Sequence, residues 1–130
     1  MAAVELTSES FESTIDNNAM VLIDFWAPWC GPCRNFAPVF EAASTRHADA
    51  VFAKVNTDEQ QQLAAAFEIQ SIPTLAIFRE QICVFAQPGA LPAAALEEII
   101  QRVKALDMDD VRRRIAEHEA NGADEDAPES

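Results

Sequence analysis

The residues of this 130-residue chain best suited to chemistry are two cysteines, Cys30 and Cys33. Only Gly31 and Pro32 separate them. In thiol–disulfide exchange a thiolate attacks a disulfide sulfur and forms a mixed disulfide, which a second thiol then resolves. Two thiols at this spacing can supply both roles from one short loop. The pair therefore predicts dithiol–disulfide exchange.

The elements on either side of the pair support this interpretation. The continuous apolar run Met20–Trp26 predicts a buried central strand before the pair, and a helical period begins at Cys33. A helix N-terminus presents unpaired N–H groups and a partial positive charge, which stabilise a thiolate. Pro32 suits the first helical turn because its φ is already helical. We expect Cys30 at the exposed tip and Cys33 turned inward beneath the first turn.

Two other interpretations of the cysteine pair need weighing. A Cys-x-x-Cys unit can be half of a zinc site, but the chain has no second cysteine pair, and His47 and His118 are remote from the first. Two buried, unreactive cysteines are the other alternative. We expect no metal site here.

The remaining segments must position the pair. Periodicity and turn residues predict a mixed sheet flanked by helices, an α/β architecture. The strands are expected at Met20–Trp26, Val51–Asn56, Thr74–Phe78 and Ile82–Phe85, and the helices at 8–15 with Ser8 as N-cap, 33–47 with a kink at Pro38, about 59–67, and 93–105.

Composition excludes several classes of function. The formal net charge is -13, so nucleic acids and anionic lipid surfaces are unsuitable partners. The N-terminal residues resemble no secretory signal, and no apolar run approaches the roughly 20 residues that cross a bilayer. Three cysteines are an odd set for a disulfide framework, which indicates a reducing, cytoplasmic setting.

The segment Asp24-Phe-Trp-Ala-Pro-Trp-Cys-Gly-Pro-Cys33 resembles the active-site signature of the thioredoxin family. Three later groups fall in that family's order: Lys54, Ile72-Pro73-Thr74 and Gly89-Ala90. The resemblance covers about residues 5–105. It implies the thioredoxin fold and a general protein-disulfide reductase, a monomer acting on oxidised protein substrates. It further implies no bound cofactor, with electrons supplied from NADPH by a flavoprotein thioredoxin reductase.

Asp24 and Lys54 are the two charged candidates near the cysteines. Asp24 lies in an otherwise apolar strand, so it is either a strand-end acid that reaches water or a buried carboxyl with a raised pKa. The resemblance favours the second and implies that Asp24 acts as acid and base for Cys33. It also implies that Lys54, on the neighbouring strand, pairs with Asp24, whereas a lysine reaching out to solvent is the alternative.

The resemblance assigns Pro73 the family's cis-proline position opposite the disulfide, although most X-Pro bonds are trans. It implies that an apolar surface around Cys30 binds the substrate. Its expected members are Trp29, Gly31, Pro32, Ile72, Pro73, Gly89 and Ala90. An exposed tryptophan such as Trp29 suits a binding surface, while Trp26 is expected to pack beneath the loop.

Three positions depart from the family pattern. The hairpin turn Arg79-Glu80-Gln81 lacks the usual glycine, which predicts strain there. Pro88 replaces a β-branched residue before Gly89, at the rim of the expected substrate surface. Cys83 falls in a strand, and the burial habits of free cysteine predict a small core residue.

Residues 1–106 are expected to form the domain and residues 107–130 an acidic extension. The extension carries nine acids against three arginines. We expect a short helix over 107–118 and disorder from residue 119, where large apolar side chains are absent. Two alternative functions remain: an oxidase or isomerase on the same fold, and a binding or chaperone module whose apolar surface matters more than its cysteines.

Overall fold

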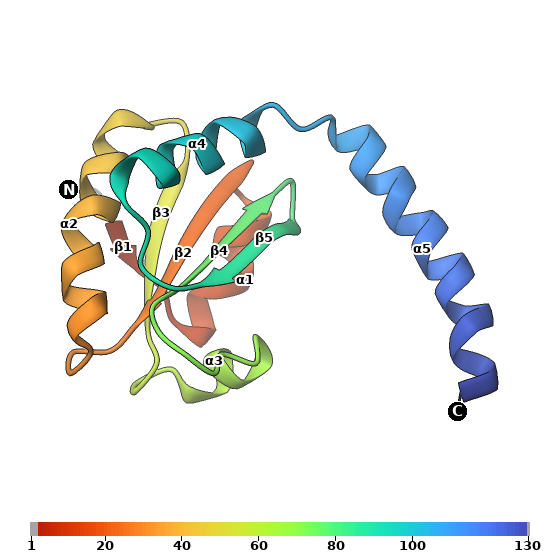
Figure 1. Ribbon diagram of the computed structural model, residues 1–130, viewed down its shortest axis with the longest axis horizontal. Coiled ribbons are helices and arrows are strands. Elements are labelled where there is room, and N and C mark those ends of the chain that lie inside the picture. The colour runs from red at the N-terminus through yellow and green to blue at the C-terminus, as the bar shows by residue number, and fades with distance from the viewer. Residues whose placement is uncertain (1–2, 130) are drawn as a thin grey trace.

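The computed structural model describes the backbone of residues 3–129 and the side chains of residues 3–120. Strands and helices alternate along the chain, and a β-hairpin and two helices complete it (Figure 1). The elements are β1 (Ala3–Glu5), α1 (Ser8–Asp16), β2 (Met20–Trp26), α2 (Gly31–Arg46), β3 (Val51–Asn56), α3 (Gln61–Ala66), β4 (Thr74–Arg79), β5 (Ile82–Pro88), α4 (Ala93–Lys104) and α5 (Met108–Glu129).

The five strands form one mixed sheet in the order β1-β3-β2-β4-β5. β2 is parallel to β3 and antiparallel to β4, so the predicted central position of Met20–Trp26 and the predicted hairpin are confirmed. The register places Asp24 of β2 beside Lys54 of β3 and Leu75 of β4. β1 was not predicted, because a three-residue strand carries too little periodicity to detect.

Each face of the sheet has its own apolar core. Phe36 and Phe40 of α2 pack with Leu96 and Ile100 of α4 on one face. On the other face, residues of α1 and α3, such as Ile15 and Leu63, pack against the sheet. Full burial of a large apolar side chain contributes roughly 1.5–3 kcal/mol, so these two layers stabilise the sheet that positions the loop after β2.

Several helix boundaries differ from the sequence prediction. Thr7, not Ser8, is the N-cap of α1, and its side chain accepts the N–H of Ser10 in a reciprocal capping box. α3 is shorter than predicted, covering Gln61–Ala66. α2 begins at Gly31 rather than Cys33 and continues through Pro38. Because α2 begins earlier, Cys30 is its N-cap residue, and the Cys30 sulfur lies at the positive end of the helix dipole.

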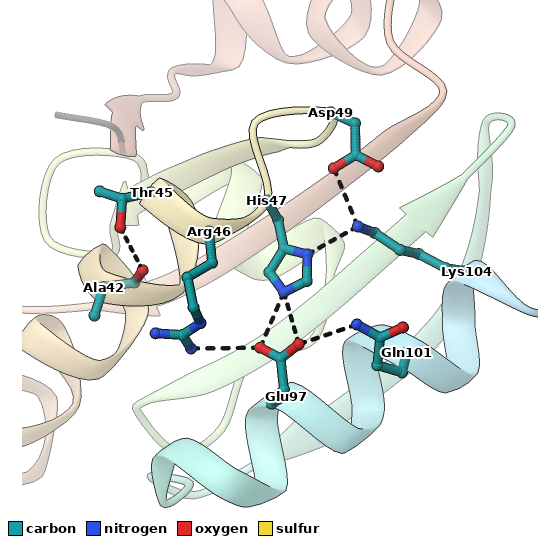
Figure 2. Close-up of polar contacts among 8 residues, drawn as sticks. All are labelled: Ala42, Thr45, Arg46, His47, Asp49, Glu97, Gln101 and Lys104. Atoms are coloured by element: carbon teal, nitrogen blue, oxygen red, sulfur yellow. Dashed lines mark hydrogen bonds and ion pairs between the residues drawn. The ribbon is translucent and has the colours of Figure 1, made fainter.

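At its C-terminal end α2 is joined to α4 by a cluster of polar side chains around His47 (Figure 2). His47 Nε2 lies 2.9 and 3.0 Å from the two carboxylate oxygens of Glu97. Lys104 Nζ donates to His47 Nδ1 at 2.8 Å and to Asp49 at 3.1 Å. Because an ammonium group only donates, Nδ1 accepts and Nε2 carries the hydrogen that Glu97 accepts.

The hairpin turn and α5 meet at the opposite end of the sheet from the cysteines. Glu80 and Gln81 both have positive φ, 51° and 72°, in a turn that would favour Asn or Gly, as the missing glycine predicted. Glu80 accepts a hydrogen bond from Arg112 of α5 at 2.7 Å, and Met108 is buried. These contacts tether the first turns of α5.

Beyond this tether α5 projects away from the sheet as one helix to Glu129 (Figure 1). The structure differs from the predicted short helix followed by disorder. A helix forms its backbone hydrogen bonds internally, so it needs no large apolar side chains to satisfy its N–H and C=O groups. Mobility of residues 119–130 in solution stays a prediction. Within residues 3–129, no helix has the length and apolar character to cross a bilayer.

Candidate functional site

Cys30 and Cys33 form a disulfide at the N-terminus of α2, with their Cα atoms 5.2 Å apart. Cys30 is the N-cap residue, and its Sγ accepts the backbone N–H of Cys33 at 3.1 Å. Pro32 lies in the first turn, as predicted. The unpaired N–H groups and the dipole of α2 therefore point toward the Cys30 sulfur, an arrangement that stabilises a thiolate after reduction.

Both cysteines are almost completely buried. Cys30 retains 4% of its accessible surface and Cys33 retains 2%, so the prediction that Cys30 occupies an exposed tip is wrong. Ala27 lies in the same small cluster, and Trp26 and Ile72 pack against it. Neighbouring segments thus cover the sulfurs from the sides.

The loop before β4 faces the disulfide. The Ile72–Pro73 peptide bond is cis, as the resemblance implied. The Sγ of Cys30 lies 3.7 Å from the carbonyl oxygen of Ile72. The N–H of Gly89 donates to the carbonyl oxygen of Pro73 at 2.8 Å, and Gly89 adopts a φ of +108°, which favours glycine. The loop before β4 thereby reaches Cys30, and Gly89 is hydrogen-bonded to that loop.

The expected substrate-contacting side chains differ in exposure. Trp29 is 67% exposed, and Pro32, Gly89 and Ala90 are also exposed, while Gly31 and Ile72 are half-buried and Pro73 is buried. The indole N–H of Trp29 donates to the Asp58 carboxylate at 3.0 Å. Asp58 was not among the predicted site residues, because one acid in a polar turn after a strand carries no distinguishing signal.

Asp24 is fully buried, with no accessible surface. Neither of its carboxylate oxygens has a hydrogen-bond partner. Burial raises the pKa of Asp24 to about 7, although the nearby positive charge of Lys54 offsets part of that rise. The alternative in which Asp24 reaches water at a strand end is therefore excluded, and a carboxyl that changes protonation near neutral pH lies in the sheet.

The strand register places Lys54 beside Asp24, but the Lys54 ammonium group lies over the ring of Trp26. Its Nζ lies 4.6 Å from the centre of the Trp26 ring. Among the described side chains, Lys54 and Asp24 form no ion pair within 4.0 Å. The pairing is therefore not a contact ion pair: Lys54 acts on Asp24 through its charge, which lowers the pKa of that carboxyl, while its ammonium group lies over the aromatic face of Trp26. Trp26 packs beneath the loop as predicted, with its indole N–H buried and unpaired.

Cys83, on the edge strand β5, is exposed, so its predicted place in the core is wrong. The alternation of inward and outward side chains along β5 is interrupted by an irregularity in its pairing with β4. The sequence contains no signal that predicts this irregularity. Partial burial of the sulfur raises the pKa of Cys83, against a hydrogen bond to Phe85 that lowers it. A raised pKa disfavours the reactive thiolate.

Comparison with known proteins identifies the family. The sequence model described as Thioredoxin matches residues 2–102. This chain belongs to the thioredoxin family. It is 57% identical over 119 residues to "Putative thioredoxin 2" of Streptomyces coelicolor, covering 92% of this chain and 89% of that protein. It is 40% identical over 104 residues to the thioredoxin of Porphyra purpurea, covering 78% and 97%.

Solved structures agree with this family and with the predicted fold. A point mutant of the thioredoxin from Halobacterium salinarum NRC-1 superposes with a TM-score of 0.76 at 32% identity, covering 82% of this chain and 94% of that one. The oxidised thioredoxin of Plasmodium falciparum gives 0.71 at 34% identity, covering 80% and 100%.

Thioredoxins are thiol–disulfide oxidoreductases that need no bound cofactor, and in this chain the Cys30–Cys33 disulfide stands at the family's active-site position. In the part of the chain that the structure describes, no three His, Cys, Asp or Glu side chains are arranged to hold a metal ion.

Proposed function

We propose that this thioredoxin-family protein is a general protein-disulfide reductase, with Cys30 as the attacking and Cys33 as the resolving thiol. The observation that carries the proposal is the Cys30–Cys33 disulfide at the N-cap of α2, beside the carbonyl of Ile72. In the reduced protein the Cys30 thiolate attacks a substrate disulfide, forming a mixed disulfide and releasing one substrate thiolate. Cys33 then attacks the Cys30 sulfur, the second substrate thiolate leaves, and the disulfide seen here is restored.

The position at the helix cap favours Cys30 as the first nucleophile. Its sulfur accepts the N–H of Cys33 and lies at the positive end of the α2 dipole. A thiolate at Cys30 is thereby stabilised by backbone groups of α2. Cys33, in the first turn, is the slightly more buried residue of the two and is proposed to act in the second step.

Asp24 is the proposed acid and base for Cys33. The second step requires a proton to leave the Cys33 thiol as it attacks, and a group whose pKa lies near the working pH is best suited to accept it. Asp24 has a pKa of about 7 and no hydrogen-bond partner that would hold its proton elsewhere. Lys54 is a positioning residue that tunes Asp24 through its charge.

The proposed substrate surface surrounds the cysteine pair. Trp29 supplies an exposed aromatic face held by Asp58, and the Ile72 carbonyl lies beside Cys30, where an extended substrate backbone can pair with it. Its further members are Gly31, Pro32, Pro73, Gly89 and Ala90.

Electrons are proposed to reach the Cys30–Cys33 disulfide from NADPH through a flavoprotein thioredoxin reductase, with oxidised proteins as substrates. The family supports this cycle. We place the protein in the cytoplasm as a monomer without nucleic-acid or membrane partners. We also propose that residues 107–130 are an extension outside a domain of residues 1–106, supported by the end of the family match at residue 102 and by the course of α5.

The test is insulin reduction driven by NADPH and thioredoxin reductase. We expect Cys30→Ser to abolish turnover, and Cys33→Ser to accumulate a mixed disulfide at Cys30 that mass spectrometry detects. Cys83→Ser is the matched control and should keep the wild-type rate, because Cys83 lies on β5, away from the pair. A double Cys30→Ser, Cys33→Ser variant that supports full cellular activity would instead favour the binding-module alternative.

The reduction potential separates the reductase from an oxidase or isomerase. Thioredoxin has a potential of about -270 mV, and isomerase-type sites have potentials of about -180 mV. Equilibration of the Cys30–Cys33 pair with glutathione buffers measures the value, and a result close to the isomerase figure would contradict the proposal.

A further inference from the structure

Lys104 is one of the two lysines of the chain, and its ammonium group is held in the cluster around His47 (Figure 2). Its Nζ donates to His47 Nδ1 at 2.8 Å and to Asp49 at 3.1 Å, so two of its three N–H groups have acceptors. The Lys104 side chain retains 26% of its accessible surface. The amine is therefore fixed by two hydrogen bonds and remains accessible from solvent.

His47 is arranged as a general base for Lys104. Its Nδ1 accepts the hydrogen bond from Lys104, while its Nε2–H donates to Glu97, whose two oxygens lie at 2.9 and 3.0 Å. The hydrogen bond from His47 lowers the pKa of Glu97 to about 2, so Glu97 is a carboxylate at neutral pH. A carboxylate in this position fixes the tautomer and stabilises the imidazolium that forms when Nδ1 takes a proton. Carboxylate, imidazole and amine thus stand in the order that activates a nucleophile.

We propose that Lys104 is a site of acylation by small, uncharged acyl thioesters. The neutral amine of Lys104 attacks the thioester carbonyl, and a C–N bond forms. His47 Nδ1 takes the surplus proton from the nitrogen, the C–S bond breaks, and the imidazolium gives that proton to the leaving thiolate. The products are an amide at Lys104 and a free thiol, with no oxidation or reduction. The site is separate from Cys30 and Cys33, because the His47 cluster lies at the other end of α2.

The charges around Lys104 favour an uncharged acyl donor. Asp49 and Glu97 are both acidic, and the chain carries a formal net charge of -13, so anionic acyl phosphates are repelled. Asp49 also acts against the reaction, because its carboxylate stabilises the ammonium form of Lys104, which has no lone pair for attack. His47 and Asp49 should therefore have opposite effects on the acylation rate.

The experiment treats the full-length oxidised protein with N,S-diacetylcysteamine, an uncharged thioester, at pH 8. The disulfide is kept intact so that Cys30 and Cys33 do not consume the reagent. Peptide mass spectrometry follows acetylation of Lys104 and Lys54 in the same sample. Lys54 is the internal reference, because its Nζ lies over the Trp26 ring and not in the His47 cluster. The measured quantity is the ratio of the Lys104 rate to the Lys54 rate.

Removal of the base or of its carboxylate partner should slow acylation. His47→Gln keeps a polar side chain but cannot take the proton, so the ratio should fall by about 10-fold, less than the roughly 100-fold that a positioned base contributes in an enclosed site. Glu97→Gln disturbs the fold less and should lower the ratio by about 3-fold, because this carboxylate is partly solvated. Glu98→Gln is the matched control and should keep the wild-type ratio, since Glu98 lies on the same helix but pairs with Arg102.

Asp49→Asn should act in the opposite direction. It removes the carboxylate that favours the ammonium form, so the ratio should rise by about 3-fold, as expected for loss of a largely solvated ion pair. This variant separates chemistry from packing. If the cluster only shielded Lys104 from the reagent, the substitutions at His47, Glu97 and Asp49 would all raise the ratio.

Three results would overturn the inference: an unchanged ratio in His47→Gln, a fall in Asp49→Asn, or a higher ratio with acetyl phosphate than with the thioester. The last result would assign the site to anionic donors. Cys83→Ser should keep the wild-type ratio. Loss of Lys104 acetylation in that variant would also contradict the inference, because the exposed Cys83 thiol would then be the group that takes the acyl group first.

Discussion

Asp24 and His47 are both buried ionisable residues, yet their surroundings are opposite. Asp24 has no accessible surface and no hydrogen-bond partner for either oxygen. His47 is 5% exposed, and both of its ring nitrogens are paired, one with Glu97 and the other with Lys104 (Figure 2). The two residues thus show two outcomes of burying a polar group, one unpaired and one paired.

The difference matches two roles that we propose, proton transfer with Cys33 for Asp24 and stabilisation of the fold for His47. An unpaired buried carboxyl destabilises the native state when it ionises, but its raised pKa makes it a proton carrier near neutral pH. The paired imidazole joins the end of α2 to α4 and leaves no polar atom unsatisfied. Substitutions at the two positions should therefore change stability in opposite directions.

Asp24→Asn should give the largest effect and increase stability. The native pKa of about 7 lies above the usual value of 3.8, so the native state binds the extra proton and the free energy of unfolding falls as pH rises between these values. At pH 8 the asparagine variant should gain up to about 4 kcal/mol, at 1.36 kcal/mol per pKa unit, and near pH 3 almost nothing.

Urea denaturation across pH 3–9 measures that gain. The same variant should slow insulin reduction by on the order of 100-fold, the lower end of what a positioned acid or base contributes. Equal stability and equal turnover at pH 8 would remove the proton-carrier role of Asp24.

His47→Ala should act in the opposite direction and lower stability by about 2–3 kcal/mol, because it leaves a cavity and frees the partners Glu97 and Lys104. Chemical denaturation at pH 7 gives the value. His118→Ala is the control, since His118 is exposed on α5. A loss no greater than that of the control would mean that the cluster contributes little to stability.

Glu97→Gln should give a smaller loss, about 1 kcal/mol or less, because the carboxylate is partly solvated. The hydrogen bond from His47, with help from Gln101, lowers the pKa of Glu97 from 4.5 to about 2. A lowered pKa stabilises the native state above the unfolded value, so the contribution is complete above about pH 4.5 and is lost as pH falls toward 2. Thermal unfolding of both proteins at pH 6 and pH 2.5 should show a clearly larger difference at the higher pH.

Lys54→Met should give the smallest effect, a shift in the pH dependence of turnover. Removing the charge that lowers the pKa of Asp24 should raise that pKa further above 7 and move the rising limb of the pH–rate profile to more alkaline pH. Lys104→Met, in the His47 cluster, should leave the profile in place. An unchanged limb in Lys54→Met would show that Lys54 does not tune Asp24.

Local pattern was enough for most of the fold. The sequence predicts well those features that depend only on neighbouring residues. These are the apolar run Met20–Trp26, the short spacing between β4 and β5, and the periodicity of α2 and α4. β1 was missed because three residues carry no period. The predicted core position of Cys83 is wrong because it rested on the burial habits of free cysteine, whereas the exposure of Cys83 depends on the edge position of β5 and on an irregularity in its pairing with β4.

The candidate site was predicted as a set of residues but not as a set of contacts. Asp24 was a sound candidate because a lone acid in an apolar strand is unusual. The turn of Lys54 toward Trp26 and the bond from Trp29 to Asp58 depend on where side chains from separate elements meet. Contacts of this kind cannot be predicted from the local sequence.

By itself the sequence determined the chemistry: a Cys-Gly-Pro-Cys loop between a buried strand and a helix can exchange disulfides, since helix capping and thiolate stabilisation are local effects. Only the tertiary structure decided the environment of that chemistry. Desolvation of Asp24, the near-complete burial of Cys30 and the position of Lys54 over Trp26 each require surfaces from several elements to pack together. Burial is a property of that packing, so no single segment of the chain specifies it.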